Sequence, residues 1–456
     1  MMNYAINAVE RSDIIKFDES ISSTESNFKL TITCIILSLA SIGIGSHLFG
    51  FDIFTDVSTL FIYLTLLFQI ATRTLRFPKI LGIVYAYIIV QTFLINISSI
   101  SFFSSLKHFI GLIIFSLSIF SFVSVYRNRL IQIIQIYYKF ALAIACIGIL
   151  QPLIFVLLGI SFIPQNLISG LLIVGGSNSF SPEIMDILPR SVGLSSEPAH
   201  YAIILLPGVF VSLLVLVGKA RHLGIHNRPI AWMILTGFVL SFSIVGYFGL
   251  ILCFISIFSK NLKGNRLTKV SVVMIFIGVF YFMSQTNLMS KINSLPSMFT
   301  NISGYQYASS DLTGFALASN ILVAREGLKK SNYLGTGLNS HEDTYDEVIY
   351  SIFSNSQVIL ELNKKDAGSF FIRITSEFGI PGILALIIFL IHYRLGKLFK
   401  SSPNKTINAI CLVVILGYCI RNGNYFSVNF MLFSALYYYT FSLQKEESNY
   451  LDSINS

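Results

Sequence analysis

The chain has 456 residues, of which 54% are hydrophobic and 12% are charged, and its mean hydropathy is +0.73. Soluble domains carry about 25% charged residues, so this composition excludes a soluble globular protein and predicts a polytopic helical membrane protein. The net charge of +9 does not indicate nucleic-acid binding, because the basic residues lie in short loops between apolar blocks, as they do on the cytoplasmic side of membrane proteins.

Residues 1–29 are polar and mixed in charge, which predicts a cytoplasmic segment without a cleavable signal peptide. Twelve apolar blocks follow, each near the ~20 residues that a membrane-spanning helix needs. These blocks are residues 30–49, 57–72, 80–98, 107–125, 138–163, 199–218, 230–242, 244–259, 270–284, 380–395, 407–420 and 428–443. Residues 444–456 form a cytoplasmic tail. The predicted fold is therefore an all-α membrane protein with about twelve transmembrane helices.

The loops between these blocks predict how the helices are oriented. Every loop after an even-numbered span is basic, beginning with Arg73, Arg76 and Lys79 after the second span, whereas most loops after odd-numbered spans carry no charge. The positive-inside rule therefore places the basic loops and both termini in the cytoplasm. This orientation requires a tight hairpin at Ser241–Ser243. If 230–259 formed one long helix instead, every later loop would change sides.

Two segments on the predicted outer (periplasmic) face are longer than the other loops. Residues 164–198 separate spans five and six within the block of nine spans at 30–284. Residues 285–379 separate this block of nine spans from the last three spans at 380–443, and they carry most of the charge on the outer face. Loops of this length in a compact protein are usually functional. We therefore expect the functional site of the protein on its outer face.

A polar stretch precedes the sixth span directly. Pro198 suits the first position of a helix, and Glu197 suits the cap before it, so one interpretation is a solvated helix start. Arg190, seven residues upstream, favours a second interpretation. An arginine offers a fork of donors that matches phosphate oxygens, and a helix N-terminus adds backbone N–H groups aimed at an anion. This combination would suit a lipid diphosphate at the membrane boundary, with His200 on the helix surface.

The same stretch begins a series of motifs. "RSVGLSSEPAHYA" (190–202) resembles an R-x-x-G-x-x-x-E-P-[SA] element. "SFSIVGYFGLIL" (241–252) resembles S-x-S-x-x-G, and "AREGLKKSNYLGTGLNS" (324–340) resembles an arginine followed by L-x-G-x-G. "TSEFGIPGIL" (375–384) resembles E-x-G-x-x-G, and "RNGNYFS" (421–427) resembles an Arg-Gly-rich loop. Together and in this order, these elements resemble the O-antigen polymerase and ligase superfamily of bacterial membrane enzymes.

The resemblance implies a glycosyltransferase in the inner membrane. Its donor would be a glycan linked to undecaprenyl diphosphate, and its acceptor a single repeat unit on the same carrier lipid. The acceptor hydroxyl would displace the lipid diphosphate at the periplasmic face, where arginines would stabilise the departing charge. A chain-length regulator is a further candidate partner. No metal or other cofactor is implied, and the acidic run "SHEDTYDEV" lacks the spacing of an EF-hand loop.

The same resemblance implies the site residues. Arg190, Arg325 and Arg421 would surround the diphosphate, although Arg325 stands ten residues before Gly335, one short of the family's R-x10-G spacing. Glu197, Asp311 and Glu377 remain open as acceptors of the hydroxyl proton, and Glu197 would equally suit bracing Arg190. The predicted catalytic residues are Arg190, Glu197 and Arg325, and the predicted substrate-binding residues are Arg421, Gly193, Gly335, Gly337, His341 and Glu377.

Two other functions remain open. A ligase, which transfers finished polymer to a lipid core, would carry a His-Asn pair about ten residues before the E-x-G-x-x-G turn. Here Ala367 and Gly368 occupy that place, and His341 lies 36 residues before Glu377, which favours a polymerase. A transporter or flippase would place its site near the middle of the membrane between similar halves, whereas the two halves of this chain look unalike.

Overall fold

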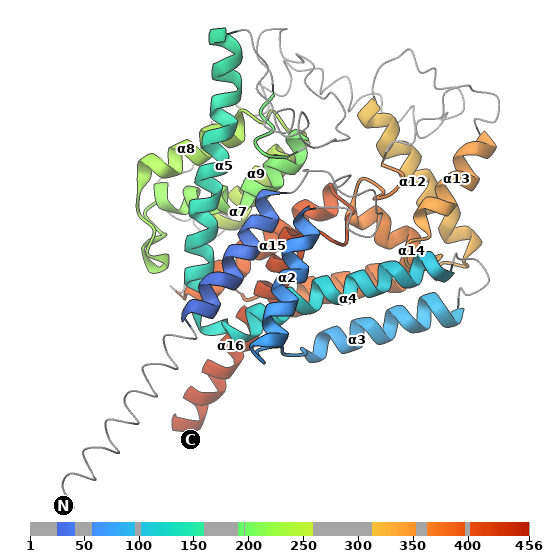
Figure 1. The fold of residues 1–456 in the computed structure, drawn as a ribbon, viewed down its shortest axis with the longest axis horizontal. Coiled ribbons are helices and arrows are strands. Elements are labelled where there is room, and N and C mark those ends of the chain that lie inside the picture. Colours follow the sequence, from blue (N-terminus) through green and yellow to red (C-terminus); the bar gives the residue numbers. More distant parts are fainter. Residues whose placement is uncertain are drawn as a thin grey trace, which may run out of the picture.

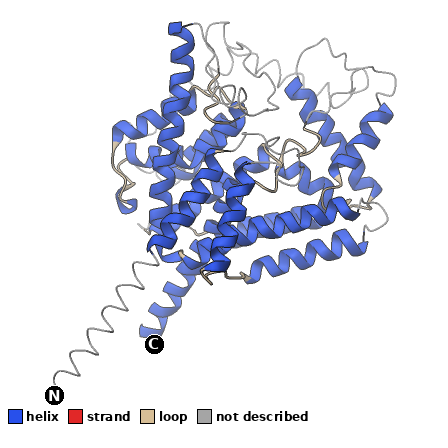
Figure 2. Ribbon diagram, viewed as in Figure 1, coloured by secondary structure: helices blue, strands red, loops and turns tan. Residues whose placement is uncertain are grey.

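The computed structural model describes residues 25–41, 57–95, 102–158, 190–195, 197–258, 312–352, 363–396 and 402–455. All regular secondary structure in these ranges is helical, with no strand (Figure 2). Most of the predicted outer segment 164–198, the predicted ninth span at 270–284 and the candidate base Asp311 lie outside the described residues.

Each predicted span within the described residues overlaps a helix. Residues 25–40 are helical. The labelled helices in Figure 1 are α2 (Val57–Ala71), α3 (Lys79–Ile88, continued by a π-helix at Ile89–Ile95), α4 (Phe102–Val125), α5 (Leu130–Leu158), α7 (Pro198–Leu216), α8 (Arg228–Val239), α9 (Ile244–Phe258), α12 (Leu312–Lys330), α13 (His341–Ile352), α14 (Phe370–His392), α15 (Pro403–Ile420) and α16 (Val428–Asn455).

Five described helices are long and apolar enough to cross a membrane: α4, α5 with its preceding turn, α7, α14 and α15. Four shorter apolar helical segments accompany them, at Ser58–Ala71, Lys79–Phe93, Arg228–Val239 and Ile244–Ile257. The protein is therefore a helical membrane protein. The crossing number of twelve remains a prediction.

Helix α7 lies at the centre of the packing, in contact with α5, α8, α9 and α15. It is apolar on every side, as expected of a helix surrounded by others, and Leu205, Val209 and Phe210 are fully buried. Small residues let the neighbouring helices approach closely. A side chain at Gly208 would place its Cβ 2.7 Å from the Cβ of Ala141 on α5.

The block 230–259 contains a helix break at the place where the sequence predicts a tight hairpin. Helix α8 ends at Val239 and α9 begins at Ile244, and Phe242 between them has a positive φ of 44°. With 12 and 15 residues, the two helices are about 18 and 22 Å long, shorter than a hydrocarbon core of about 30 Å. They pack on different neighbours, α8 on α5 and α7, and α9 on α7 and α15.

Contacts at one end of the bundle join loops that we predict to be cytoplasmic. Arg129 pairs with Glu25 at the start of the first helix, and Arg127 pairs with Glu446 on α16 at 2.8 Å. Helix α16 projects from this same end (Figure 1). The basic loop after the fourth span therefore lies beside both ends of the described chain.

Contacts at the opposite end join loops that we predict to be on the outer face. The Ser191 N–H donates to the carbonyl of Leu240, in the break between α8 and α9, at 2.9 Å. The Asn422 N–H donates to the carbonyl of Gly368 at 3.0 Å. In each of these contacts both partners belong to the same predicted side, which supports the predicted alternation of the loops. The candidate site lies at this end.

Candidate functional site

The segment that carries Arg190 is held in place by one glutamine of α5. The side-chain oxygen of Gln151 accepts the N–H groups of Val192 and Gly193, both at 2.9 Å, and its amide nitrogen donates to the Gly193 carbonyl at 2.9 Å. Gly193 has a φ of +58°, and a Cβ there would lie 2.5 Å from the ring of Tyr201. The predicted ligand Gly193 therefore serves the packing of this segment.

One of the predicted arginines, Arg421, pairs with Glu197, and the charge of a second, Arg190, also acts on this carboxylate. Nη2 of Arg421 donates to Oε2 of Glu197 at 3.0 Å, and both side chains are partly exposed, at 21% and 32%. Burial alone would raise the pKa of Glu197, but the charges of His200, Arg421 and Arg190 and the hydrogen bond to Arg421 hold it below its usual value. Glu197 is therefore ionised at neutral pH and braces Arg421, which makes it a weak proton acceptor.

The end of α15 and the turn at 363–369 together fix the position of Arg421. The Ser369 hydroxyl donates to the Cys419 carbonyl at 2.6 Å, in the last turn of α15. A side chain at Gly368 would place its Cβ 3.2 Å from Nη1 of Arg421, so a glycine here leaves room for the guanidinium. Among the described residues, Glu197 is the hydrogen-bond partner of the Arg421 guanidinium, which leaves donors on Nη1 and Nε for a ligand.

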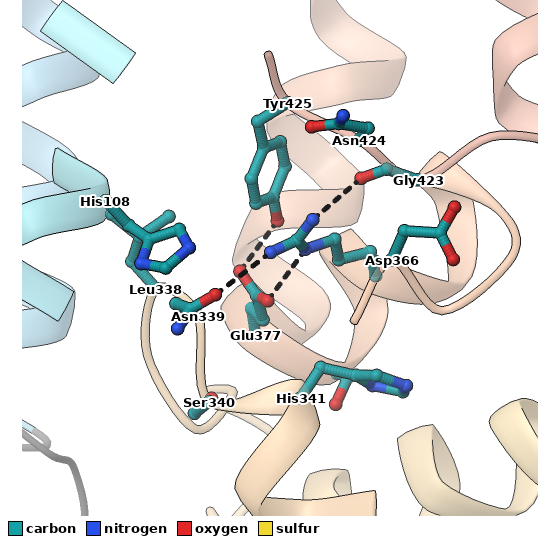
Figure 3. A network of polar contacts seen from close by, with 12 residues as sticks. His108, Leu338, Asn339, Ser340, His341, Asp366, Glu377, Gly423, Asn424 and Tyr425 are labelled. Atoms are coloured by element: carbon teal, nitrogen blue, oxygen red, sulfur yellow. Dashed lines mark hydrogen bonds and ion pairs between the residues drawn. The ribbon is translucent and has the colours of Figure 1, made fainter. Parts of the chain in front are cut away.

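A second charged group lies deeper at the same end (Figure 3). Arg373 on α14 is 3% exposed, and Glu377, one turn later, is 0% exposed. Arg373 donates from Nε to Oε1 of Glu377 at 2.9 Å, from Nη1 to the Gly423 carbonyl at 3.1 Å and from Nη2 to Oδ1 of Asn339 at 3.3 Å. The Tyr425 hydroxyl donates to Oε2 of Glu377 at 2.9 Å.

This buried pair assigns Glu377 a structural role. Both of its carboxylate oxygens have hydrogen-bond partners, and none of its surface is exposed. The guanidinium of Arg373 also lies over the ring of Tyr425, 4.2 Å from its centroid. Glu377 is therefore closed off from solvent by its own partners. Sequence reasoning did not select Arg373, although a charged i, i+4 pair directly before an apolar span was the available signal.

The two predicted ligands Gly335 and Gly337 lie where a loop crosses a break in α14. The break is at Gly379, whose φ of +60° is not helical. The Gly337 N–H donates to the Glu377 carbonyl at 2.8 Å. A Cβ at Gly335 would lie 2.5 Å from that same carbonyl oxygen. These glycines therefore allow two backbones to meet, which explains the L-x-G-x-G pattern without a ligand.

His341, another predicted ligand, is buried at the start of α13 with 1% exposure. Its Nε2 lies 2.8 Å from Oδ1 of Asn320 on α12, and Asn320 donates from its amide nitrogen to the Ala316 carbonyl, so Nε2 carries the hydrogen. Burial, aided by the charge of Arg373, lowers the pKa of His341 to about 3. The ring is therefore neutral at neutral pH and closed off from solvent.

Arg325 does not join the other two predicted arginines. It is 61% exposed, on the solvated face of α12, and its guanidinium donates from Nε and Nη2 to the neighbouring Glu326. The helix explains this position, because α12 buries Val323 and Ala324 and the next side chain projects away from them. Within the described residues, the partner of the Arg325 side chain is therefore Glu326, and Arg325 does not share the Arg421–Glu197 contact.

The acidic run at 340–348 is held by a lysine. The Lys364 amino group lies 2.8 Å from Oδ1 of Asp346 and 3.8 Å from Oε1 of Glu342. Within the described part of the chain, no cluster of three histidine, cysteine or acidic side chains has a geometry that could hold a metal ion.

Comparison with known proteins identifies no relative. The chain matches no protein-family profile, no curated protein and no solved structure.

Proposed function

We propose that the protein is a polysaccharide polymerase of the bacterial inner membrane. It joins oligosaccharide repeat units carried on undecaprenyl diphosphate into an O-antigen or a similar surface polysaccharide. The observation that carries this proposal is the pairing of the partly exposed Arg421 with Glu197 at the N-terminus of α7. The charge of Arg190 also acts on Glu197.

This arrangement suits a diphosphate better than a neutral ligand. The guanidinium of Arg421 keeps donors on Nη1 and Nε, and guanidinium forks bind phosphate oxygens through two parallel hydrogen bonds. Helix α7 begins at Pro198, and no side chain caps it, so its first backbone N–H groups add a favourable field for an anion. One glutamate beside two arginines leaves a net positive charge for the ligand.

The proposed reaction is a displacement at the sugar carbon that carries the diphosphate. The acceptor hydroxyl attacks this carbon, and the bond to the diphosphate breaks. Negative charge then accumulates on the leaving group, which Arg190 and Arg421 stabilise more strongly in the transition state than in the substrate. Glu197 positions Arg421 through its ion pair. The carrier lipid holds both substrates in the membrane, next to this end of the bundle.

The proposed orientation follows from the charge of the loops. The end of the bundle with Arg127 and Arg129 is the cytoplasmic end, and the end with Arg190 and Arg421 faces the periplasm. Twelve crossings, with a large periplasmic loop between the ninth and tenth, complete the proposed topology. A cysteine placed at the exposed Tyr333 and labelled with an impermeant maleimide in intact spheroplasts tests this side. Labelling only after lysis would contradict it.

The decisive experiment supplies the purified protein with one defined undecaprenyl-diphosphate-linked repeat unit. A polymerase yields a ladder of products that differ by one unit, and Arg421→Ala abolishes the ladder while the protein remains folded. Transfer to a lipid-core acceptor without a ladder would show a ligase instead. Movement of the lipid across a vesicle without new glycosidic bonds would show a flippase, and either result would refute the proposal.

A further inference from the structure

Among the described residues, neither of the two candidates for accepting the proton of the acceptor hydroxyl is well placed to do so. Glu377 is fully buried with both oxygens bonded, and the Glu197 carboxylate is held in its ion pair with Arg421. Proton acceptance requires a carboxylate or imidazole within hydrogen-bond reach of the substrate. The outer end of the bundle therefore needs a third, more accessible group.

Asp366 has the properties that Glu197 and Glu377 lack. It lies in the turn at 363–369, is half-buried, and its Oδ1 accepts the Gly368 N–H at 3.0 Å. Among the described residues, Oδ2 has no hydrogen-bond partner, and no cation pairs with the carboxylate. The hydrogen bond to Gly368 fixes the direction of the side chain and leaves one oxygen for a substrate.

The position of Asp366 relative to Arg421 follows from Gly368. Gly368 contacts the Asp366 carboxylate through its N–H, and its α-carbon faces Nη1 of Arg421. The carboxylate and the diphosphate-binding guanidinium therefore lie on either side of a single backbone position. Asp366 also acts electrostatically on His200, in the first turn of α7. It thus lies beside the Arg421–Glu197 pair, without neutralising Arg421 itself.

A histidine at the same end is less well placed. His108 on α4 is half-buried, and its Nδ1 lies 2.9 Å from the Ser104 carbonyl. In the view of Figure 3, His108 and Asp366 lie on opposite sides of Glu377 and Tyr425. The loop that begins with Arg421 adjoins Asp366 through Gly423. A base on the side of His108 would be separated from the leaving group by the buried pair.

We propose that Asp366 is the general base of the glycosyl transfer, an inference that rests on the proposed polymerase function. The acceptor oxygen forms the new bond to the sugar carbon and gives its proton to Oδ2 of Asp366. The bond between that carbon and the diphosphate oxygen breaks, and its electron pair stays on the diphosphate beside Arg421. The protonated Asp366 then releases its proton to water, which returns the site to its starting state.

Asp366→Asn tests this role without disturbing the turn, because the amide oxygen still accepts the Gly368 N–H. We expect the extension rate of the purified full-length protein to fall by about 10²–10⁴-fold, the contribution of a positioned base. Binding of undecaprenyl diphosphate should remain within about threefold of wild type, since Arg421 is untouched. The matched control is Glu347→Gln on α13, an exposed carboxylate paired with Lys330, which should leave the rate unchanged.

The pH profile separates a base from a residue that only shapes the turn. The wild-type rate should fall at acidic pH as the base becomes protonated, and the residual rate of Asp366→Asn should lose this dependence. A rate within about threefold of wild type, or an unchanged acidic limb, would overturn the assignment of Asp366 alone. If the wild-type protein formed no ladder at all, the polymerase function itself would fail, and this inference with it.

Discussion

Replacing Glu377 by leucine should destabilise the protein severely, because it leaves a buried positive charge without its anion. Arg373 is 3% exposed, and its other partners, the Gly423 carbonyl and Asn339 side chain, are neutral. Removing one partner of a buried ion pair costs about 3–5 kcal/mol. The Tyr425 hydroxyl also loses its acceptor in this variant.

The double replacement Arg373→Met with Glu377→Leu should be more stable than Glu377→Leu alone. Apolar side chains of similar volume remove both charges at once, and such replacements are often neutral for stability. The recovery should be incomplete, because the Tyr425 hydroxyl and the Gly423 carbonyl remain without partners. The two single changes and the double change form a cycle whose coupling free energy measures the pair directly.

Unfolding of the purified variants in mixed micelles, with increasing amounts of denaturing detergent, measures these differences. The control is Glu347→Leu, the same substitution in the exposed Lys330–Glu347 pair, where a loss of less than about 1 kcal/mol is expected. If the effects of the two single changes at Arg373 and Glu377 simply add, the two side chains are not coupled. The buried network would then not be what holds this end together.

Three further outcomes test the geometry. Gly335→Ala should abolish accumulation of folded protein, since its Cβ would lie 2.5 Å from a carbonyl oxygen. Gly218 has a similar φ of +73° but open space around it, so Gly218→Ala should lower the free energy of unfolding by only about 1–2 kcal/mol. Expression followed by gel filtration compares the two variants. His341 has a pKa of about 3, below its unfolded value of ~6.5, so between these values only the unfolded state takes up the proton. The free energy of unfolding should therefore fall as the pH drops below about 6.5, by up to ~1.4 kcal/mol per pH unit. His341→Asn should show a smaller fall in melting temperature between pH 7.5 and 4.5 than the wild-type protein. Equal falls in the two proteins would contradict this expectation. Arg421→Ala should reduce the extension rate at least tenfold more than Arg325→Ala. Arg421→Lys should retain little of the wild-type rate, because an ammonium replaces a two-pronged donor. Equal losses of rate at positions 421 and 325 would favour the arginine pattern of the resemblance over the observed geometry.

The positions of the helices were predictable because runs of apolar residues determine where they form. Each apolar block in the described residues overlaps a helix, and even the break at 240–243 was indicated by its polar serines. The contact between the loop at Gly335 and the break in α14 was not predictable in the same way. It joins Gly335 to Gly379 across more than forty residues, and nothing local in either motif indicates that the two backbones touch.

The candidate site was predictable in part. Glu197 and Arg421 meet although they lie more than two hundred residues apart in the sequence, and both are predicted site residues. The side chain of Arg325 faces solvent because the period of its helix, and not its motif, decides its direction. Residues that act by supporting others, such as Gln151 and Arg373, are recognisable only from the backbone groups and charges that surround them.

The break in α14 also bears on the order in which the chain can be assembled. The carbonyl of Glu377 has no partner within the helix, because Pro381 lacks an N–H, and it accepts hydrogen bonds from the Gln91 side-chain amide and the Gly337 N–H instead. Both donors leave the ribosome before α14 does, since synthesis proceeds from the N-terminus. An exposed backbone group in lipid costs several kcal/mol. A chain in which one of these donors was missing would be a substrate for quality-control proteases, so Gln91→Leu should shorten the lifetime of the full-length protein in the cell.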